Sequence, residues 1–358
     1  MPTQPILDSV SVQAQTKPIQ IGLLGLNFGE SIAKKIAECV DCLKVVAVCE
    51  VDQAKLQRVA RGLGVKAYGE LDLMLDDPEI EAVAVFSGSS GRARLISKIL
   101  QRDRHVLTTK PFELEVSEAE QVLLEAQERG LVVHLNSPGP ESPEDIATIQ
   151  NWMEQYDMGR PLAFHAKTWS NYREQPNSTW YDDPEKCAAA PILRLGIYFL
   201  NEFASFMGKP RTVHVVQSRI FTKRPTSDHA HMTIEFENGS IGTVFASFCI
   251  EDGHSWRDDI TLNFERGTVN RWMERFSEKD MSRDYAVTEL WKKGMNPIRS
   301  KTAPGSFAGW YQWEAFQRAI RQGEGLTAKY ANDILYGIRL LEAMRLSAIS
   351  GKTVEVNF

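Results

Sequence analysis

The sequence predicts two domains: an α/β domain with a doubly wound parallel sheet, then an α+β domain on a mostly antiparallel open sheet. Apolar strand-like runs alternate with helix-like segments between residues 21 and 135, as in parallel sheets whose crossovers are helices. Beyond residue 160, strand-like runs follow one another across tight turns such as Asn238-Gly239, which is typical of antiparallel hairpins. A length of 358 residues also exceeds what one ordinary core holds.

The first strand, turn and helix form a unit that can bind a pyrophosphate. An apolar run at 21–24 leads to Gly25, and helical spacing follows through Ile32 and Ile36. The strand delivers the chain to a tight turn, and the helix offers unpaired N–H groups and the positive end of its dipole. The residues expected to bind a dinucleotide here are Gly25, Asn27, Phe28 and Gly29.

The glycine pattern of this turn is incomplete. The second glycine of a G-x-G-x-x-G pattern is Asn27 and the third is Glu30, while Gly29 comes one residue early. Asn tolerates a positive φ better than most residues, so the turn can form. An acid at a helix start suits the dipole but opposes a phosphate. We therefore expect weak dinucleotide affinity, and the alternative interpretation is an ordinary strand–turn–helix of an α/β protein.

The second strand indicates which dinucleotide would bind. The apolar run 43–49 ends at Glu50, ~20 residues past the glycine turn, where an acid accepts a hydrogen bond from the ribose 2′-hydroxyl. Because the same acid would repel a 2′-phosphate, NAD is expected and NADP is disfavoured. The alternative is a solvated acid at a strand end.

The later strands of the first domain bring further residues to the same sheet edge. Strand-like runs at 66–68, 82–86, 105–108 and 131–135 alternate with helix-like runs at 54–63, 71–75, 92–102 and 117–129. Ligands bind at the carboxyl ends of such strands. Lys110 is the first candidate for chemistry, because a lysine here can bind a ribose hydroxyl, a substrate oxygen or a neighbouring phenol; an exposed loop lysine is the alternative. The cofactor-binding residues predicted at this edge are Ser87, Gly88, Thr109, Lys110, Pro111 and Asn136.

The second half begins after a proline-rich segment at 138–143. The polar and aromatic stretch 171–186 is interpreted as a substrate flap around Trp180, or else as a surface connection. A helix from about residue 191 to residue 208 carries Tyr198, by default a core aromatic. Residues 273–307 are expected to be irregular. The other expected strands are 161–169, 213–218, 231–236, 241–248, 260–264, 269–272 and 353–356, and the other expected helices are 144–156, 310–320 and 327–348.

These motifs, in this order, resemble the Gfo/Idh/MocA oxidoreductases over nearly the whole chain after its N-terminal arm. The resemblance rests on the glycine turn, Glu50, DDPEIEAVAVFS at 76–87 and HVLTTKPF at 105–112. In that family the fifth strand ends in a Glu-Lys-Pro-like motif, in which Thr109 here replaces the glutamate while Lys110 and Pro111 match. The expected division is an arm at 1–18, a dinucleotide-binding Rossmann domain at 19–137, and a substrate-binding and oligomerisation domain at 138–358 whose last helices pack back on the first.

The resemblance also assigns roles on the Tyr198 helix. Family members carry a G-G-x-L-x-D-x-G-x-H-x-x-D-like pattern there, and in the branch with glucose–fructose oxidoreductase and dimeric dihydrodiol or xylose dehydrogenases a tyrosine replaces the histidine. Here Arg194 stands at the first aspartate, Tyr198 at the histidine and Asn201 at the last aspartate. Tyr198 is thereby implied to be the acid/base, with Arg194, Asn201 and Trp180 binding substrate. Arg194 departs from both patterns and admits an acidic or phosphorylated substrate.

The resemblance implies an NAD(P)-dependent oxidoreductase that transfers a hydride between nicotinamide and a sugar, polyol or sugar-acid-like hydroxy compound. An ammonium at Lys110 near Tyr198 should favour phenolate and lower the phenol pKa by ~1–3 units. One alternative is a non-catalytic dinucleotide-binding regulator, favoured by the departures at Asn27, Glu30, Thr109 and Arg194. Another is a carbohydrate-cleaving enzyme that uses tightly held NAD through transient oxidation.

Composition and charge indicate which classes of partner the protein lacks and in which cellular compartment it is expected. The net charge is −6 without a long basic run, which argues against nucleic acid, and no apolar run is long enough to span a bilayer. The N-terminal arm does not read as a signal peptide, and five cysteines suit a reducing compartment, so a cytoplasmic protein is expected. His229 and His231 share a strand face without an apparent third ligand, so no metal is expected. The family resemblance implies a homodimer or homotetramer through the C-terminal sheet.

Overall fold

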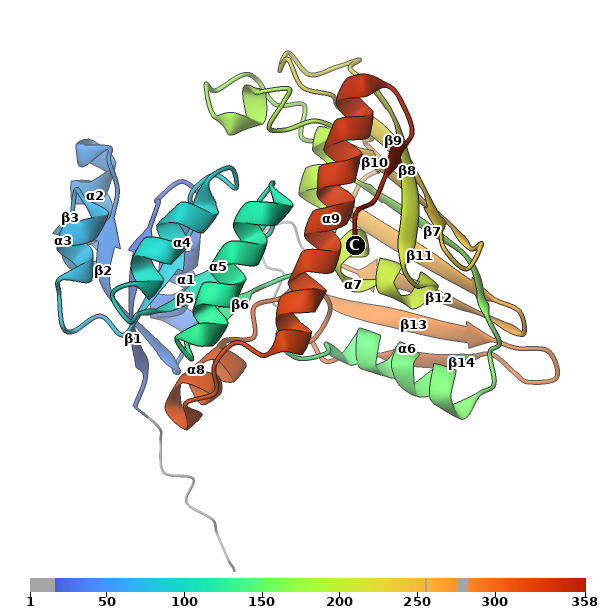
Figure 1. Ribbon diagram of the computed structural model, residues 1–358, viewed down its shortest axis with the longest axis horizontal. Helices are drawn as coiled ribbons and strands as arrows, with labels where there is room; N and C mark the ends of the chain where they lie inside the picture. Colours follow the sequence, from blue (N-terminus) through green and yellow to red (C-terminus); the bar gives the residue numbers. More distant parts are fainter. Residues whose placement is uncertain (1–16, 255, 276–282) are drawn as a thin grey trace, which may run out of the picture.

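The structure, a computed structural model, describes residues 17–254, 256–275 and 283–358. Two sheets stand side by side, and the long helix α9 (Ala328–Ser350) runs between them (Figure 1). Residues 1–16 of the expected N-terminal arm lie outside the described residues. No helix in the described ranges has the length and apolar character needed to cross a membrane.

The first sheet is parallel, as predicted. In the described residues, its six strands take the order β3-β2-β1-β4-β5-β6 and all pair in parallel. The strand order reverses beside β1, so the crevice for a ligand opens at the carboxyl ends of β1 and β4. The strands are β1 (Ile19–Leu24), β2 (Leu43–Cys49), β3 (Lys66–Tyr68), β4 (Ala82–Val85), β5 (His105–Thr108) and β6 (Val133–Leu135).

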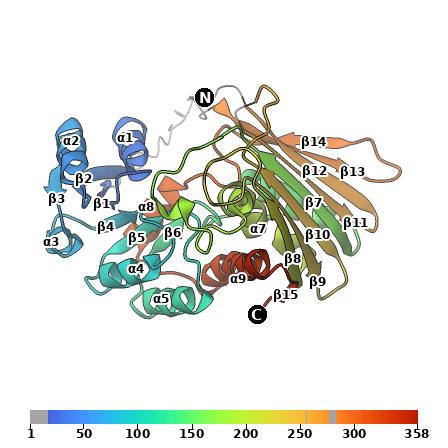
Figure 2. The ribbon, with the colours of Figure 1, turned by 90° about the horizontal axis from the view of Figure 1, so that it is seen from above.

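Helices cover both faces of this sheet, which is why its strands read as continuous apolar runs. In Figure 2, α1 (Gly29–Cys39) and α2 (Gln53–Leu63) lie on one face, and α4 (Arg92–Leu100) and α5 (Val116–Glu128) lie on the other. The short helix α3 (Leu71–Leu75) sits at the edge beside β3. All four residues of β4 are buried between these layers.

The second sheet is mostly antiparallel, also as predicted. Its nine described strands take the order β14-β13-β12-β11-β7-β10-β9-β8-β15, and β7 pairs in parallel with β10. Helix α6 (Glu144–Gln155) lies beside β13, and α7 (Ile197–Glu202) lies among the buried residues of the inner face. The strands are β7 (Pro161–Trp169), β8 (Pro210–Ser218), β9 (His229–Phe236), β10 (Ile241–Ser247), β11 (Arg257–Phe264), β12 (Gly267–Glu274), β13 (Tyr285–Trp291), β14 (Ile298–Lys301) and β15 (Val354–Glu355).

One sequence-based expectation for this half was wrong, and one helix forms with mixed geometry. The segment 273–307 is not irregular, because it contains β13 and β14; its residues 276–282 lie outside the described part. Long-range pairing with β12 holds β13 in place, and β14, a short charged edge strand, carries no clear alternation in sequence. The helix expected from about 191 is a π turn at Ile192–Gly196, then α7, then a 3₁₀ turn at Ala204–Met207.

The last helices contact both units. Helix α8 (Trp313–Gln322) packs Phe316 into the core of β1 and α1. Helix α9 buries Ile334 and Ile338 in the core of the first sheet, and Leu340 and Met344 in the core of the second. A single helix therefore joins the two hydrophobic cores and fixes the walls of the space between them.

Candidate functional site

A cavity of about 1210 Å³ lies between the two units. One wall is the carboxyl edge of the parallel sheet, and the other comes from the segment 172–181, the π turn and α7. The sequence-predicted residues that line it are Gly25, Asn27, Phe28, Glu50, Ser87, Gly88, Thr109, Lys110, Pro111, Asn136, Trp180, Arg194 and Tyr198.

The glycine turn forms despite its incomplete pattern. Gly25 has φ of 88°, and a Cβ there would lie 3.0 Å from the carbonyl oxygen of Phe86, so a side chain is excluded both by conformation and by space. Glu50 holds the next residue, because its Oε2 accepts a hydrogen bond from Leu26 N–H at 2.9 Å. Asn27 Oδ1 accepts one from Lys55 Nζ at 2.6 Å, which brings a cation to the turn that sequence spacing did not reveal.

Two cations offset the negative charge of Glu30 that was expected to oppose a phosphate. Its carboxylate forms hydrogen bonds with both terminal nitrogens of Arg58, at 2.8 and 2.6 Å, and with Lys34 Nζ at 2.8 Å. These two cations, Arg58 first, lower the pKa of Glu30 to about 2. The acid at the start of α1 is therefore surrounded by compensating positive charge and is not an isolated negative group facing a phosphate.

Gly29 does not line the cavity. A Cβ at this position would lie 3.0 Å from the ring of Phe86, so Gly29 allows α1 to approach the residue that follows β4. Phe28 does line the cavity and is half exposed, with its ring edge-on to Phe86 at 5.7 Å between centroids. The one-residue shift of the glycine thus serves helix packing.

Arg92 is a cavity residue that sequence reasoning missed. Its buried guanidinium donates to the carbonyl oxygens of Ser87, Thr109 and Pro111, so it ties the loop after β4 to the loop after β5. Burial lowers its pKa to about 10. A charged residue directly after the flexible turn SGSSG was the available signal, but nothing in the sequence showed that its side chain would turn inward.

Asn136 positions the segment that carries Lys110. Its Oδ1 accepts hydrogen bonds from Lys110 N–H at 3.1 Å and Thr109 Oγ1 at 3.2 Å, while its Nδ2 donates to the Gly309 carbonyl at 3.0 Å. The buried amide therefore links the end of β5 to a loop from the far end of the chain. Asn136 is a backbone anchor as well as a residue of the cavity wall.

Lys110 and Tyr198 meet across the two units. Lys110 Nζ lies 4.6 Å from the centroid of the Tyr198 ring and donates to the Arg194 carbonyl at 2.6 Å. Burial first, and then the guanidinium groups of Arg194 and Arg92, lower the pKa of Lys110 to about 7. The ammonium thus lies over the face of the Tyr198 ring.

The expectation of a lowered Tyr198 pKa was wrong. Burial raises the pKa of Tyr198 above its usual value and the nearby Tyr311 adds to this, whereas the hydrogen bond with Asn136 opposes it only in part. Tyr198 is therefore a protonated phenol at neutral pH. In this form it can donate a hydrogen bond but cannot accept a proton as a base.

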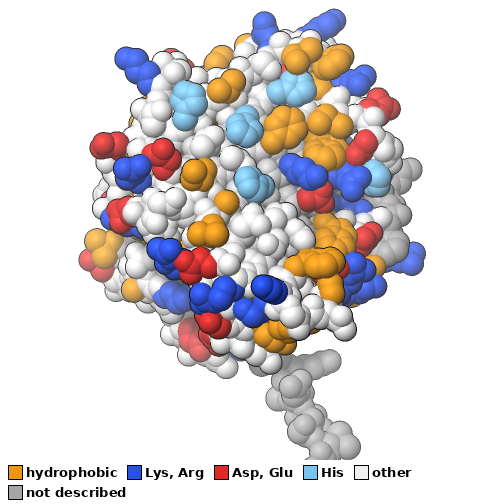
Figure 3. All heavy atoms as spheres, turned by 90° about the vertical axis from the view of Figure 1, so that its right-hand side faces the viewer, with side chains coloured by type: hydrophobic (Ala, Val, Ile, Leu, Met, Phe, Trp, Pro, Cys, Tyr) orange, Lys and Arg blue, Asp and Glu red, His pale blue; other side chains and the backbone are white. Residues whose placement is uncertain are grey.

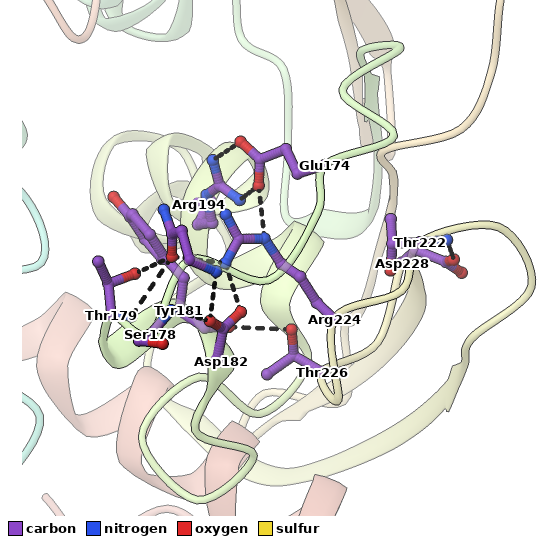
Figure 4. Close-up of polar contacts among 11 residues, drawn as sticks. Glu174, Ser178, Thr179, Tyr181, Asp182, Arg194, Thr222, Arg224, Thr226 and Asp228 are labelled. Carbon is purple, nitrogen blue, oxygen red and sulfur yellow. Dashed lines mark hydrogen bonds and ion pairs between the residues drawn. The ribbon is translucent and has the colours of Figure 1, made fainter.

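Arg194 lines the cavity but its charge is already paired. Its two terminal nitrogens donate to the two carboxylate oxygens of Glu174 at 2.6 and 2.9 Å (Figure 4). Although burial opposes it, this bond raises the pKa of Arg194. Arg194 therefore has its counter-ion within the protein, in the segment 171–186, and whether it binds an acidic substrate stays a prediction.

Asn201 lies outside the cavity. Its Nδ2 donates to the carbonyl and the hydroxyl of Ser137 at 2.9 and 3.2 Å, and its Oδ1 would lie 2.0 Å from a Cβ on Gly337 of α9. The side chain is thus held between the domain boundary and α9. These contacts are structural, and Asn201 is not among the described residues that line the cavity.

One group of potential metal ligands lies on the second sheet. The sequence showed no third ligand for His229, but in the described residues Asp228, His229 and Cys249 place their ligand atoms within 4.8 Å of one another. The Asp228 carboxylate accepts backbone N–H bonds from residues 220–222 at 2.7 to 3.0 Å. We assign Asp228 to holding that turn, and we propose no metal.

Comparison with protein families gives matches in both units. Residues 19–137 match the model described as an oxidoreductase family with an NAD-binding Rossmann fold, and residues 146–270 match the Gfo/Idh/MocA C-terminal domain. Together the two matches cover most of the chain.

Curated relatives and solved structures agree with these matches. The chain is 23% identical over 252 residues to scyllo-inositol 2-dehydrogenase (NAD(+)) of Bacillus subtilis, covering 68% of this chain and 71% of that protein. It is 24% identical over 304 residues to dTDP-3,4-didehydro-2,6-dideoxy-α-D-glucose 3-reductase of Streptomyces antibioticus, covering 83% and 87%. The WlbA dehydrogenase of Bordetella pertussis, solved with NADH and UDP-GlcNAcA, shares the fold with a TM-score of 0.72 at 15% identity, covering 95% and 99%.

Proposed function

Because the chain belongs to the Gfo/Idh/MocA family of oxidoreductases, we propose that it transfers a hydride between NAD(P) and a ring carbon that carries a hydroxyl or keto group. The observation that carries this proposal is the meeting of Lys110 and Tyr198, one from each unit, in the cavity that also contains the glycine turn. The turn proposed to bind the dinucleotide and the residues proposed to transfer the proton thus line the same cavity.

The cavity fits a dinucleotide. Gly25 leaves the backbone open, and Asn27 and Phe28 precede the start of α1, where N–H groups favour a pyrophosphate. Glu50 lies in the wall at the end of β2, where it suits a ribose hydroxyl and disfavours a 2′-phosphate. We therefore propose NAD as the preferred form. When bound, the nicotinamide ring supplies or accepts the hydride.

Two residues of the chain, Tyr198 and Lys110, are proposed to transfer the proton and stabilise the charge that accompany hydride transfer. In the direction of reduction, the protonated Tyr198 hydroxyl donates its proton to the oxygen on which negative charge develops as the hydride arrives. Because burial raises its pKa, the phenol gives up this proton only to a strongly basic oxygen. Lys110, with a pKa of about 7, can hold or release a proton at neutral pH and stabilises negative charge on the ring that it faces. The hydrogen bond to the Arg194 carbonyl fixes its position.

The substrate class follows from the relatives and the wall of the cavity. The curated relatives act on an inositol and on a deoxy keto-sugar, and the cavity presents Tyr172, Trp180, Tyr181 and Trp256 to a ligand. A hydroxylated ring suits such a site, since aromatic side chains pack on its apolar faces while polar groups orient its hydroxyls. We propose a cyclic polyol or a sugar.

The outer face of the second sheet supports a proposal of self-association. Half-exposed and exposed side chains stand in register across it, and Figure 3 shows hydrophobic and histidine side chains between charged ones on this face. An open apolar sheet face is a frequent interface, so we propose a homodimer or homotetramer. The row consists of Val216, His231, Phe245, Lys167, Asp259 and Trp272.

The oligomer proposal has a direct test. Phe245→Asp places a charge in the centre of this row and should shift the mass measured by light scattering to that of a monomer. Leu124→Asp, an exposed site on α5, is the matched control and should not. An unchanged mass for Phe245→Asp would remove the sheet face as the interface.

Free thiols favour a cytoplasmic location. Cys42, Cys49, Cys187 and Cys249 are buried and unpaired among the described cysteines, as is usual in a reducing compartment. We propose the cytoplasm on this basis.

The function is tested by titrating the purified protein with NADH and NADPH, followed by a hydride-transfer screen over inositols, sugars and keto-sugars. We expect binding of NADH and turnover of at least one cyclic substrate. Failure to bind either dinucleotide would refute the proposal. Binding with release of a cleaved sugar would favour NAD-assisted carbohydrate cleavage, and binding without turnover would favour the regulator.

A further inference from the structure

The substrate end of the cavity carries little charge. Among the described lining residues from the second half of the chain, Arg194 is the one with a formal charge; the others are aromatic, aliphatic or neutral polar. Tyr181 and Tyr172 face the Arg194 guanidinium at 4.3 and 5.2 Å from its central carbon to their centroids. What a ligand meets here depends on how the Arg194 charge is balanced.

Glu174 balances it within the protein. The bidentate bond between Arg194 and Glu174 uses both terminal nitrogens of the guanidinium, which are the atoms that would bind a substrate carboxylate or phosphate. The Arg194 side chain is 15% exposed and that of Glu174 is 28% exposed, so the pair is shielded from solvent and little screened.

A second pair fixes Glu174 in place. Arg224, whose side chain is 6% exposed, donates from Nε to Glu174 Oε2 at 3.0 Å and also binds the Asp182 carboxylate. Asp182 in turn accepts the backbone N–H groups of Asn177 and Ser178, both at 2.7 Å (Figure 4). The network thus contains two guanidinium groups and two carboxylates, and its formal charges cancel.

An anion that binds the same two nitrogens of Arg194 in the bidentate manner would have to displace Glu174. That would leave a carboxylate without its bidentate partner inside a largely buried network, which is costly. Of the cations that line the cavity from the first half, Lys110 donates to the Arg194 carbonyl and Arg92 donates to three backbone carbonyls. Among the described lining residues from the second half, the one cation, Arg194, already has a carboxylate partner.

On the premise of the proposed function, we propose that Glu174 is a specificity-determining residue. It acts as an internal counter-ion to Arg194, so that the aromatic-walled end of the cavity accepts uncharged hydroxylated rings and rejects sugar acids and sugar phosphates.

The test compares matched ligands by calorimetry on the protein saturated with NADH. D-Glucose, D-glucuronate and D-glucose 6-phosphate are titrated into wild type, Glu174→Gln and the control Glu185→Gln, which removes an exposed acid from the same segment. Wild type should bind the two anions no more tightly than glucose. Glu174→Gln frees Arg194 and should bind glucuronate about ten- to a hundredfold more tightly than wild type does, whereas Glu185→Gln should match wild type.

Two results would overturn the proposal. One is a wild-type preference of about tenfold or more for either anion over glucose, a comparison that holds even if Glu174→Gln does not fold. The other is a folded Glu174→Gln protein without any gain for the anions. The double variant Glu174→Gln/Arg194→Gln removes both charges and should lose the gain. A fluorescence titration with NADH precedes each experiment and tests the proposed function itself. Absence of NADH binding in that titration would refute the proposed function, whatever the role of Glu174.

Discussion

Replacement of Lys110 by Met should stabilise the protein relative to wild type at low pH and abolish turnover at every pH. Lys110 sits in the wall between the two units, where burial and two nearby guanidinium groups lower its pKa from 10.5 to about 7. The folded protein therefore resists the charged form, while the unfolded chain does not. Met fills a similar volume without a charge.

The magnitude follows from the two pKa values. Below about pH 7 the lysine is charged in both states and the folded protein bears the full cost of the buried charge. Between the folded and unfolded pKa values the unfolded state binds more protons, so stability rises with pH until about pH 10.5. From about pH 6 to about pH 9 this one group should change the free energy of unfolding by ~3 kcal/mol.

The assay is equilibrium unfolding in urea at these two pH values for wild type and Lys110→Met. Loss of the bond to the Arg194 carbonyl lowers the variant's stability by ~1 kcal/mol at each pH, so the difference between the two pH values isolates the titration. Wild type should gain ~3 kcal/mol relative to the variant on going to the higher pH. Parallel pH dependences for the two proteins would refute a buried, pKa-shifted Lys110.

Three further variants test the site. Tyr198→Phe should lower turnover about 10²- to 10⁴-fold with NADH affinity unchanged, and unchanged turnover would exclude Tyr198 as the proton donor. Gly309→Ala should reduce both turnover and thermal stability, because its Cβ would lie 2.8 Å from the Tyr198 ring at φ of 93°. Gly294→Ala, at φ of 84° with open space around it, is the control that shows the effect of backbone strain alone. Equal losses of turnover and stability in the two variants would refute the contact with Tyr198. Glu50→Gln should lower the preference for NADH over NADPH about tenfold, measured by fluorescence titration, and an unchanged ratio would contradict a ribose contact.

The parts of the fold that could be predicted are those where local pattern and tertiary environment agree. A strand buried on both faces, such as 82–85, must be apolar throughout, so its run of Ala and Val is visible in sequence. Strand β14 has no such constraint, because its residues Ile298–Lys301 lie at a sheet edge. The strand forms because it pairs with β13, and this pairing cannot be predicted from the local sequence.

The site shows a similar division. Sequence order located the residues that follow parallel strands, because topology alone carries Ser87, Thr109 and Lys110 to one edge. It missed Arg92, whose role depends on three carbonyl groups from two loops. The family resemblance assigned Asn201 to substrate binding, but the close approach of α9 and the bonds to Ser137 hold its side chain outside the cavity.

The electrostatics of Glu30, Tyr198 and Arg194 depend on contacts that the sequence does not show. A charge in a folded protein acts through its partners and its exposure. Arg58 and Glu174, which come from other segments, supply counter-ions to Glu30 and Arg194. For Tyr198, desolvation outweighs the ammonium beside its ring. The sequence thus indicates which residues lie at this cavity. The net charge and the direction of the pKa shifts around them follow from the long-range packing of the flap segment and the two sheets.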